Sequence, residues 1–586
     1  MPTIELNLTD LQSLLGRELP KTIEELNEIL AYVKGEVKQL LGDEVSIEIK
    51  DSNHPDLWSA EGIARALRSF LEIEKGLKNY VVRSPSGVVV NVDKHLENVR
   101  PYIGCAVIRN VDLNDTSIKG LMHLQDKLDQ TYGRKRKRTS IGLYEFDLIK
   151  PPLMYGVSKP NETSFVPLGY EEEMTLEEIL EKHPKGLEFG EIVKEHDYWP
   201  ILKDSEGKVL SFPPIINSND LGRITGDTKN VLIEVTGTVE NTVLDTLTIL
   251  AVCLADRKGT IHSSIINYPY GKKRKLATPN LKPRRISLSI EYIQQILGMD
   301  LTKRSVKTLL EKAGYRAALG RGGVLEIAIP CYRLDIMHPI DLVEDVAIAY
   351  DYNRIKPAWP EHATPGGESD QTRFSSLIRE LMIGYGFQEA LTYDLTNPEK
   401  IFTKMNMKPK DFVELSNPRM ITHTCLRSWL LPSLMELLSC NTHVEYPQRI
   451  FEVGYCVAPD KGVENYALDH LKLTGVDADT NTSFSKIASV LKSLTSNLGF
   501  EAKIEETDHA SFIQGRAGRI VIDNAEAGII GEVHPAVLEA WGLEVPVSAF
   551  ELDVKHLLRP RLPEYSFISS PKGVEKVHNS LRNGCV

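Results

Sequence analysis

The segment CYRLDIMHPIDLVEDVAIAY, residues 331–350, gathers four carboxylates in a short stretch of chain. Asp341, Glu344 and Asp345 are spaced i, i+3 and i+4, and the proline just before them is typical of a helix start. These three acids are therefore predicted to share one face of a helix. The fourth acid, Asp335, comes from the extended stretch before that helix. The segment places an acidic cluster where a strand gives way to a helix.

Two interpretations of this cluster are compatible with its spacing. In the first, Asp341 is the N-cap and forms a capping box with Glu344, and acids in the first turn suit the helix dipole. In the second, the acids hold a cation, because neighbouring carboxylates repel one another unless a cation or the nearby guanidinium of Arg333 compensates them. Ligands that are all oxygen suit Mg²⁺, which keeps several waters and takes one or two carboxylates. The residues alone leave both interpretations open.

Length and composition indicate a cytoplasmic protein of several domains. The 586 residues are too many for one core and predict roughly three to five domains. No stretch approaches the ~20 apolar residues of a membrane span. The seven cysteines are scattered without a C-x-x-C pair, which predicts reduced thiols. The net charge of −12 disfavours a protein that coats nucleic acid, although it is compatible with a local basic patch.

Breaks in the sequence pattern divide the chain into four domains and a tail. VVRSPSGVVVNV, which starts at residue 81, predicts a β-hairpin that turns at 85–87. Linkers rich in Pro, Gly and Lys separate the later parts. The sequence predicts an α+β multidomain protein with a small helical or mixed domain at 1–80, an α+β domain at 81–276, a helix-turn-helix-like domain at 285–357, an antiparallel sheet with helices at 365–557, and a weakly structured tail at 558–586.

The acidic segment resembles the hallmark of the B5 domain of phenylalanyl-tRNA synthetase β chains, Y-R-x-D-I-x-x-x-x-D-L-x-E-[DE]-[VI]-A. The residues that fit it are Tyr332, Arg333, Asp335, Ile336, Asp341, Leu342, Glu344, Asp345, Val346 and Ala347. The resemblance implies that Asp335, Asp341, Glu344 and Asp345 form a Mg²⁺ site shared with an α subunit, and it favours the metal interpretation. The similarity covers about residues 1–555, follows the shorter archaeal and eukaryotic cytosolic type, and makes the domain at 1–80 B1-like.

The domain at 81–276 resembles the B3/B4 editing domain of that family through LKDSEGKVLSFPPIINS and VLIEVTGT. The resemblance implies hydrolysis of tyrosine mischarged onto the tRNA for phenylalanine, which needs a second site because an apolar pocket rejects an added hydroxyl poorly. By position, Leu202, Ser211, Glu234 and Thr236 match the residues of the editing pocket. Glu234 and Thr236 are two apart on a predicted strand and so face the same way. Without the family, they would be ordinary polar residues of an edge strand.

Two further segments are singled out by their residues. DSNHPDLWSAEGIARAL, residues 51–67, resembles the family string D-x-N-R-P-D-L-x-S-x-E-G-x-A-R, with His54 in place of the usual arginine. Asp56 and Glu61 in this segment are expected to be structural. RKRKR, residues 134–138, is the most basic run of the chain. It could contact RNA phosphates, but a solvated turn is the favoured interpretation.

The region at 365–557 resembles the catalytic-like module of the β chain, an inactive relative of class II synthetases. RIFE, residues 449–452, resembles the Arg-x-Glu of their second motif. The region contains no G-x-G-x-x-x-R stretch of the kind that holds ATP phosphates. We therefore expect no amino-acid activation here and interpret Arg449 and Glu452 as a structural strand pair.

The resemblance as a whole implies the β subunit of a phenylalanine–tRNA ligase. In an α₂β₂ enzyme, ATP and phenylalanine would bind to the α subunit. This chain would supply subunit contacts, the shared Mg²⁺ site and hydrolytic editing, with tRNA-Phe as the RNA partner. The alternatives are a free-standing aminoacyl-tRNA deacylase and a non-enzymatic RNA-binding scaffold. A free-standing deacylase has no need of a module like that at 365–557, which favours the ligase subunit.

Overall fold

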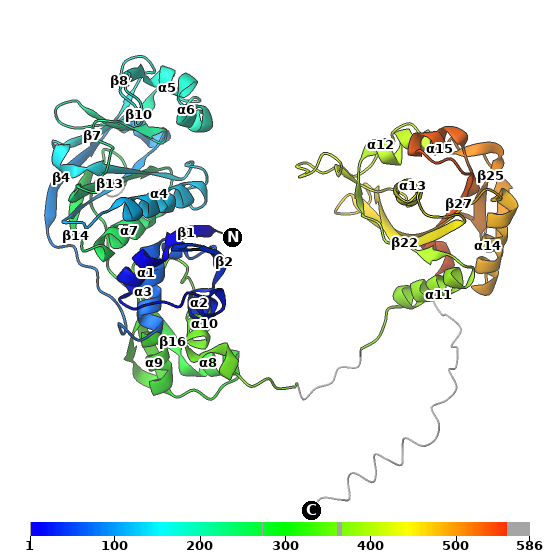
Figure 1. The fold of residues 1–586 in the computed structure, drawn as a ribbon, viewed down its shortest axis with the longest axis horizontal. Helices are drawn as coiled ribbons and strands as arrows, with labels where there is room; N and C mark the ends of the chain where they lie inside the picture. The colour runs from blue at the N-terminus through cyan, green and yellow to red at the C-terminus, as the bar shows by residue number, and fades with distance from the viewer. Residues whose placement is uncertain (1, 272–273, 360–365, 559–586) are drawn as a thin grey trace, which may run out of the picture. The chain divides into compact units, whose positions relative to one another are not determined.

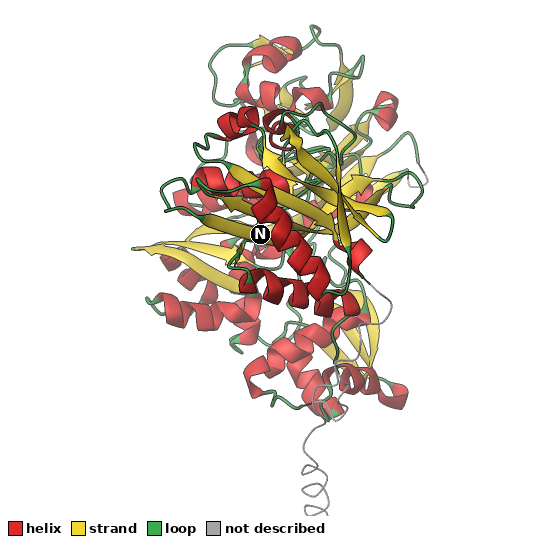
Figure 2. Cartoon of the chain, turned by 90° about the vertical axis from the view of Figure 1, so that its right-hand side faces the viewer, coloured by secondary structure: helices red, strands yellow, loops and turns green. Residues whose placement is uncertain are grey.

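The computed structural model of the chain describes residues 2–271, 274–359 and 366–558. The chain separates into two compact units, Met1–Trp359 and Pro360–Val586. Both units mix helices with sheets, which confirms the predicted α+β multidomain class (Figures 1 and 2). None of the helices in the described ranges is long and apolar enough to cross a membrane.

The first unit begins with a small sheet covered by helices, with strands in the order β1-β3-β2. Leu11, Leu26 and Ile63 of the helices form one buried core with Ile4 and Ile47 of the strands. The sequence predicted a small helical or mixed domain here but did not locate the strands, because short alternating segments are a weak signal beside helical spacing. The elements are β1 (Thr3–Asn7), α1 (Leu8–Leu15), α2 (Ile23–Leu30), β2 (Gly35–Leu41), β3 (Glu44–Ile49) and α3 (Ala60–Phe70).

A ten-stranded mixed sheet dominates the first unit (Figure 1). Its order is β12-β11-β10-β7-β4-β14-β5-β13-β6, and β15 pairs with β14. Strand β14, which comes late in this region, lies between β4 and β5 and joins the two halves of the sheet. The strands are β4 (Pro85–Val92), β5 (Tyr102–Arg109), β6 (Thr139–Glu145), β7 (Leu153–Ser158), β10 (Trp199–Lys203), β11 (Val209–Phe212), β12 (Ile216–Asn217), β13 (Asn230–Gly237), β14 (Thr260–Asn267) and β15 (Lys275–Thr278).

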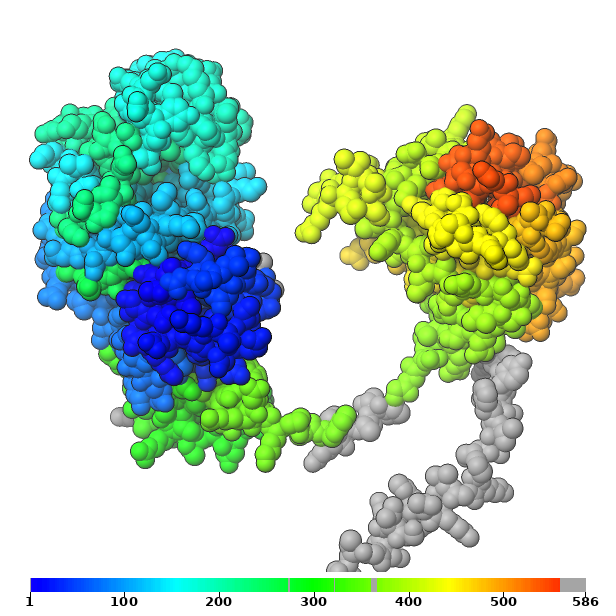
Figure 3. Space-filling view, in the orientation of Figure 1, coloured from blue at the N-terminus to red at the C-terminus, as the bar shows by residue number. Residues whose placement is uncertain are grey.

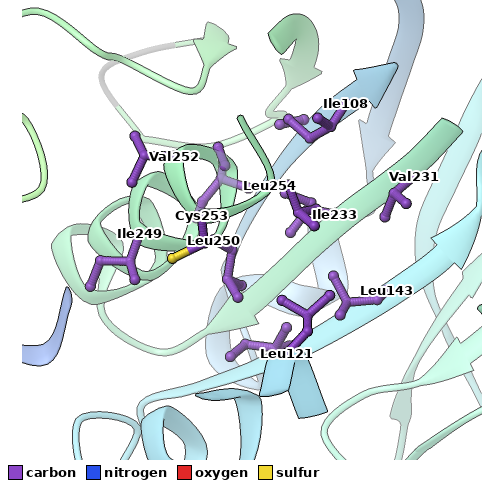
Figure 4. Close-up of a cluster of buried hydrophobic side chains, with 14 of the residues drawn as sticks. Ile108, Leu121, Leu143, Val231, Ile233, Ile249, Leu250, Val252, Cys253 and Leu254 are labelled. Atoms are coloured by element: carbon purple, nitrogen blue, oxygen red, sulfur yellow. The ribbon is translucent and has the colours of Figure 1, made fainter. Parts of the chain in front are cut away.

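Helices and one small separate sheet accompany these strands. Helix α7 packs its apolar face on the sheet, where Ile249, Leu250 and Leu254 meet Ile108 of β5 and Ile233 of β13 (Figure 4). All five side chains are buried, so this contact holds β13 firmly in place. The remaining elements are α4 (Asp115–Gln130), β8 (Ser164–Phe165), β9 (Met174–Thr175), α5 (Leu176–Lys182), α6 (Pro184–Phe189) and α7 (Glu240–Asp256).

The two edges of the large sheet come together. Tyr144 on the edge strand β6 donates a hydrogen bond to Oδ1 of Asn217 on the other edge strand, β12, at 3.4 Å. The backbone N–H of Glu145 donates to the carbonyl of Leu221, just after β12, at 3.3 Å. The sheet is therefore strongly curled, and the strands that are first and last in its order lie side by side.

The predicted β-hairpin near the start of this sheet is wrong. Residues from Pro85 onward belong to one strand, β4, whose neighbours β7 and β14 both run parallel to it. The register with β14 shifts from Ser263 opposite Pro85 to Ile265 opposite Val89. Gly87 takes the left-handed conformation there, with a φ of +88°. The turn-forming residues make a bulge, because the partners of this strand come from distant parts of the chain.

The third part of the first unit is a small sheet, order β16-β18-β17, with three helices. Figure 3 shows the N-terminal residues (blue) packed directly on this part (green), and Lys34 forms an ion pair with Glu344 there at 2.6 Å. Its last helix begins at the proline that predicted its start. The elements are β16 (Arg284–Ser289), α8 (Ile290–Leu297), α9 (Lys303–Lys312), β17 (Arg316–Leu319), β18 (Val324–Ile329) and α10 (Pro339–Tyr350).

The second unit is built on a seven-stranded sheet in the order β19-β22-β23-β27-β26-β25-β24. Neighbouring strands are antiparallel except β19 and β22, which are parallel. The predicted tail lies outside the described residues from residue 559 onward. The elements are α11 (Asp370–Gly384), β19 (Gln388–Glu389), β20 (Leu395–Thr396), α12 (Pro398–Ile401), β21 (Cys425–Leu426), α13 (Leu431–Cys440), β22 (Gln448–Pro459), β23 (Ala467–Ala478), α14 (Phe484–Asn497), β24 (Ala502–Glu506), β25 (Phe512–Ile522), β26 (Ala525–Val533), α15 (Pro535–Trp541) and β27 (Val547–Asp553).

Candidate functional site

A cavity of about 210 Å³ opens where the edges of the large sheet meet. Ser211 on β11 and Glu234 on β13, two of the four predicted pocket residues, line this cavity. Pockets that bind drug-sized ligands have volumes of about 300–1,000 Å³. A smaller cavity of this volume suits a group the size of an amino-acid side chain. Polar side chains that share the lining are Gln125, Asp126, Arg136, Ser140, Lys185 and Asn217.

Glu234 is only 2% exposed although it carries a carboxyl group. Tyr144 on the neighbouring strand donates a hydrogen bond to its Oε2 at 2.8 Å, whereas Oε1 has no well-aligned hydrogen-bond partner among the described residues. Burial raises the pKa of Glu234 to about 7, in spite of the opposing effects of Tyr144 and Arg100. Near neutral pH the carboxyl group therefore exists in both forms and can accept or donate a hydrogen bond.

Gly142 provides the space in which Tyr144 and Glu234 meet. It lies directly opposite Glu234 in the register of β6 and β13. A Cβ at this position would collide with the Tyr144 hydroxyl and come within 2.5 Å of Oε2 of Glu234. The carboxyl–hydroxyl pair therefore depends on a residue without a side chain.

Thr236 lies behind the cavity wall. Its Oγ1 accepts a hydrogen bond from Nε of Arg100 at 3.0 Å and lies 3.2 Å from Oγ of Ser140. Arg100 is 1% exposed and also donates to the Thr236 carbonyl and to Ser140. Burial lowers the pKa of Arg100. This network ties β13 to β6 beside Glu234, so Thr236 can act on the cavity by positioning its wall.

Leu202, the fourth predicted pocket residue, does not line the cavity. It is fully buried in a core cluster that includes Tyr144 and Tyr155. In the register of β10 and β11 it lies opposite Ser211. Its contribution is therefore packing beside Ser211 within the core.

The basic run at 134–138 departs from the favoured prediction at one residue. The run is a turn, but the side chain of Arg136 points inward and lines the cavity. Its Nε lies 3.0 Å from Oδ2 of Asp129, and its Nη1 donates to the carbonyls of Pro214 and Ile215. Sequence reasoning missed this residue because five consecutive basic residues carry no periodicity that singles out the buried one.

Arg333 forms ion pairs with two of the four predicted metal ligands. Its Nη2 lies 2.7 Å from Oδ2 of Asp335 and 2.8 Å from Oδ2 of Asp345, so one guanidinium joins two of the acids. Tyr315 also donates a hydrogen bond to Asp345. Burial acts to raise the pKa of Asp335, but Arg333 and His54 outweigh it and hold this pKa well below its usual range.

The predicted N-cap at Asp341 is three residues too late. The N-cap of α10 is His338, because the proline of this segment occupies the first helical position. Asp341 closes the capping box from the third position, where its Oδ2 accepts the backbone N–H groups of Met337 and His338, both at 2.7 Å. Glu344 takes no part in the box; its side chain is 52% exposed and pairs with Lys34.

The four acids offer the oxygen ligands that Mg²⁺ prefers, but two of them are already ion-paired with Arg333. Asp341 and Glu344 are three apart on one face of α10 and both reach solvent. Two carboxylates completed by waters are a usual Mg²⁺ environment. The charges of the inner two acids, Asp335 and Asp345, are compensated by Arg333. An ion held by all four acids would therefore have to displace this guanidinium.

The segment at 51–67 packs against the same acids. Nε2 of His54, which replaces the arginine usual in the family, lies 2.9 Å from Oδ1 of Asp56 and 3.8 Å from Oδ1 of Asp335. Ligand atoms of these three residues all fall within 4.8 Å of one another. Glu61 is buried and forms an ion pair with Arg257 at 2.5 Å. Asp56 and Glu61 thus pair with His54 and Arg257 inside the protein, as expected of structural residues.

Arg449 and Glu452 in the second unit are not a pair with each other. Glu452 is 1% exposed, and Nη1 of Arg427 lies 2.8 Å from its Oε1. Nε of Arg449 lies 3.0 Å from Oδ1 of Asp477. Residues three apart on a strand face opposite sides, so the expected strand pair is corrected to two separate ion pairs.

Two parts of the chain match domain families of phenylalanyl-tRNA synthetase or of tRNA synthetases in general. Residues 286–352 match the tRNA synthetase B5 domain, and residues 355–554 match the phenylalanyl tRNA synthetase beta chain CLM domain. The first match contains α10 and the acidic segment, and the second contains the seven-stranded sheet.

Similarity to individual proteins extends over almost the whole chain. The "Phenylalanine--tRNA ligase beta subunit" of Pyrococcus horikoshii is 44% identical over 563 residues, which are 95% of this chain and 100% of that protein. The protein of the same name from Pyrococcus furiosus is 45% identical over 563 residues, with the same coverage. The chain belongs to the phenylalanine–tRNA ligase β-subunit family. Membership confirms the resemblance that the acidic segment first indicated.

One solved structure of this family matches more than half of the chain. The N-terminal fragment of the phenylalanyl-tRNA synthetase β-subunit from Pyrococcus horikoshii is 42% identical, with a TM-score of 0.57. It corresponds to 60% of this chain and to 100% of the fragment. The fold is therefore shared with this family over a part of the chain about as long as the first unit.

Proposed function

We propose that this chain is the β partner of an α₂β₂ phenylalanine–tRNA ligase, whose α subunit binds ATP and phenylalanine and charges tRNA-Phe. The observation that carries the proposal is the similarity over 95% of the chain to proteins named as the β subunit of that ligase. The second unit would contribute subunit contacts rather than amino-acid activation, since its sequence lacks the arginine-containing stretch that holds ATP phosphates in class II synthetases.

Exposed apolar side chains of the second unit support a role in assembly. Leu391 is 83% exposed, Tyr393 82% and Ile421 94%. The ring centroids of Tyr393 and His423 are 6.2 Å apart, so the two segments that carry these side chains lie together. A grouped apolar surface of this kind is typical of a face that another protein covers.

Hydrolytic editing of mischarged Tyr-tRNA is the second part of the proposal. The cavity has the volume for an amino-acid side chain, and Oε1 of Glu234 and Oγ of Ser211 are buried polar atoms of its lining residues without a well-aligned partner among the described residues. The tyrosine hydroxyl would complete the hydrogen bonds of this carboxyl group, and phenylalanine would leave them incomplete. A site built in this way rejects the analogue without the hydroxyl strongly, because a buried polar group left unpaired costs free energy.

Assembly and hydrolysis can be tested together. The purified chain is mixed with its α partner, light scattering follows the mass of the complex, and Tyr-tRNA hydrolysis is measured with and without α. We expect a heterotetramer and a hydrolysis rate that Glu234→Ala lowers at least tenfold. Hydrolysis without assembly would indicate the free-standing deacylase, and RNA binding with neither would indicate the scaffold. Hydrolysis unaffected by Glu234→Ala would remove the assigned pocket.

We further propose that Asp335, Asp341, Glu344 and Asp345 hold Mg²⁺ shared with the α subunit. The support is the all-oxygen donor set and the solvent access of the outer two acids. When bound, the ion would bridge the two chains. The capping box of this chain would orient α10, and Asp335 and Asp345 would join the ion only where it takes the place of the Arg333 guanidinium.

The magnesium proposal is tested on assembly. The variant Asp341→Asn with Glu344→Gln is titrated with Mg²⁺ in the presence of α, and the complex is followed by light scattering. We expect a higher Mg²⁺ midpoint for assembly. The matched control, Glu177→Gln with Glu181→Gln, removes two exposed acids from α5 and should leave the midpoint unchanged. Equal midpoints in all three proteins would leave Asp341 with its capping role alone.

A further inference from the structure

The turn that contains the basic run has an unusual backbone. Arg134, Lys135 and Arg136 have φ angles of +49°, +53° and +63°, so three consecutive non-glycine residues are left-handed. Each such residue costs about 1–2 kcal/mol relative to the right-handed conformation. A conformation of this cost persists only where its surroundings enforce it, and such places concentrate at functional sites.

The surroundings of the turn do enforce it. The backbone N–H of Arg136 donates to the Asp129 carbonyl at 3.0 Å, and that of Arg138 donates to the Gly133 carbonyl at 2.8 Å. From outside the turn, Nη1 of the buried Arg100 donates to the Arg136 carbonyl at 3.1 Å. The Thr238 hydroxyl adds a hydrogen bond to the Lys137 carbonyl at 3.0 Å. The turn is a rigid part of the cavity wall.

Among the five basic side chains of the run, this geometry directs one inward, leaves three exposed and leaves Arg138 half-buried. Arg136 points to the cavity, where its guanidinium also lies 4.4 Å from the centre of the Phe189 ring. Arg134, Lys135 and Lys137 are exposed and form no ion pair with any residue in the described ranges. Many exposed lysines elsewhere in this domain are paired, for example Lys182 with Glu178 at 2.7 Å.

We propose that Arg134, Lys135 and Lys137 bind phosphates of the single-stranded 3′ end of an aminoacyl-tRNA whose amino acid occupies the cavity. The inference rests on the hydrolytic role proposed above. An amino acid that enters a cavity of about 210 Å³ brings the strand to which it is esterified to the mouth. Three uncompensated cations fixed on a rigid turn beside the cavity-lining Arg136 suit the charge of that strand. Lys185 also lines the cavity, but its charge is paired with Glu188 at 3.1 Å.

The experiment uses the full chain in complex with α and two readouts. The first is the affinity for a short single-stranded RNA that ends in the CCA sequence common to tRNAs, measured by fluorescence anisotropy over a series of salt concentrations. The second is the hydrolysis of Tyr-tRNA and of tyrosyl-adenosine, which lacks phosphates. The test variant is Arg134→Gln with Lys135→Gln and Lys137→Gln. A charge-preserving variant carries Arg134→Lys, Lys135→Arg and Lys137→Arg.

A charge-matched variant elsewhere controls for net charge: Lys303→Gln with Arg304→Gln and Lys307→Gln on α9. We expect the test variant alone to lose affinity for the RNA and to lower the slope of log affinity against log salt by about 2, since each single-strand phosphate contact contributes about 0.7. Its KM for Tyr-tRNA should rise about tenfold or more, with kcat and tyrosyl-adenosine hydrolysis unchanged.

The outcomes separate this inference from the function on which it rests. An unchanged salt slope and KM in the test variant overturn the phosphate surface, whatever the hydrolytic activity. A reduced slope in the charge-preserving variant also counts against it, because that variant retains the cations. If the wild-type complex hydrolyses neither substrate, the editing proposal fails, and loss of RNA affinity confined to the test variant still supports the surface.

Discussion

The Tyr144 hydroxyl donates a hydrogen bond to the Glu234 carboxyl group at 2.8 Å across the seam between β6 and β13. This contact holds one oxygen of a buried acid that lines the cavity and leaves the other oxygen without a well-aligned partner among the described residues. Tyr144 belongs at the same time to the contact between the two sheet edges, through Asn217. One phenol therefore links the shape of the cavity to the orientation of its acid.

Tyr144→Phe should lower the hydrolysis of Tyr-tRNA about tenfold through kcat, because a hydrogen bond to such a group contributes about 1.5–3 kcal/mol. Binding through the rest of the RNA should leave KM close to that of the wild type. Steady-state kinetics with Tyr-tRNA measures both constants. Tyr155→Phe is the matched control, since it removes an equally buried hydroxyl that donates to the Arg100 carbonyl instead. Equal losses in the two variants would point to general destabilisation.

Gly142→Ala should destabilise the first unit by about 1–3 kcal/mol, because the new methyl group overlaps the Tyr144 hydroxyl. Thermal unfolding of the single variants and of the double variant Gly142→Ala with Tyr144→Phe measures the coupling. We expect the double variant to be more stable than the sum of the single changes predicts, since the hydroxyl that clashes is absent. Strict additivity would show that the methyl group is accommodated elsewhere.

Glu234→Gln should remove a pH dependence from the stability of the first unit. The pKa of Glu234 rises from 4.5 in the unfolded chain to about 7 in the folded protein, so the folded state binds the proton more tightly. This contribution to stability is fully present below pH 4.5 and is lost as the pH rises through about 7, up to about 3 kcal/mol in total. Denaturant unfolding at pH 5 and pH 9 should show a smaller loss of stability for the variant than for the wild type. Parallel losses would contradict the raised pKa.

Arg333→Met should destabilise the first unit by about 3–5 kcal/mol, because it leaves the buried Asp345 and the half-buried Asp335 without their shared cation. If these acids can take Mg²⁺, the ion should raise the unfolding temperature of the variant more than that of the wild type. Differential scanning calorimetry with and without Mg²⁺ provides the comparison. Arg427→Met, which breaks the buried pair with Glu452, should be destabilised without any gain from Mg²⁺.

The sequence predicted the parts of the fold that carry strong local signals. Helix α10 begins at the proline that predicted its start, and its acids lie at the predicted spacing along the helix. The predicted hairpin after residue 81 failed, because parallel pairing of β4 with β7 and β14 is a non-local event that turn-forming residues cannot reveal. The order of strands in the large sheet is likewise set by contacts between distant segments.

At the candidate site, position within the family led to Ser211 and Glu234, which line the cavity. The rule that residues two apart share a strand face does not tell whether a face is open, and Thr236 is covered by Arg100. Arg100 itself stands alone in the sequence and gave no signal. Side chains such as Arg100 and Arg136, which come from isolated positions and turns, can be assigned to the site only when the arrangement of the surrounding strands is known.

The position of β14 has a consequence for the order of events in the cell. This strand is the bridge between the half-sheet that carries Ser211 and the half-sheet that carries Glu234, and it is made of residues Thr260–Asn267. A chain that has been synthesised only up to about Asp256 contains Ser211 and Glu234 but not the strand between the two half-sheets that carry them. A nascent or truncated chain that stops earlier would carry every lining residue of the cavity but would lack the strand that lies between the two halves of its sheet.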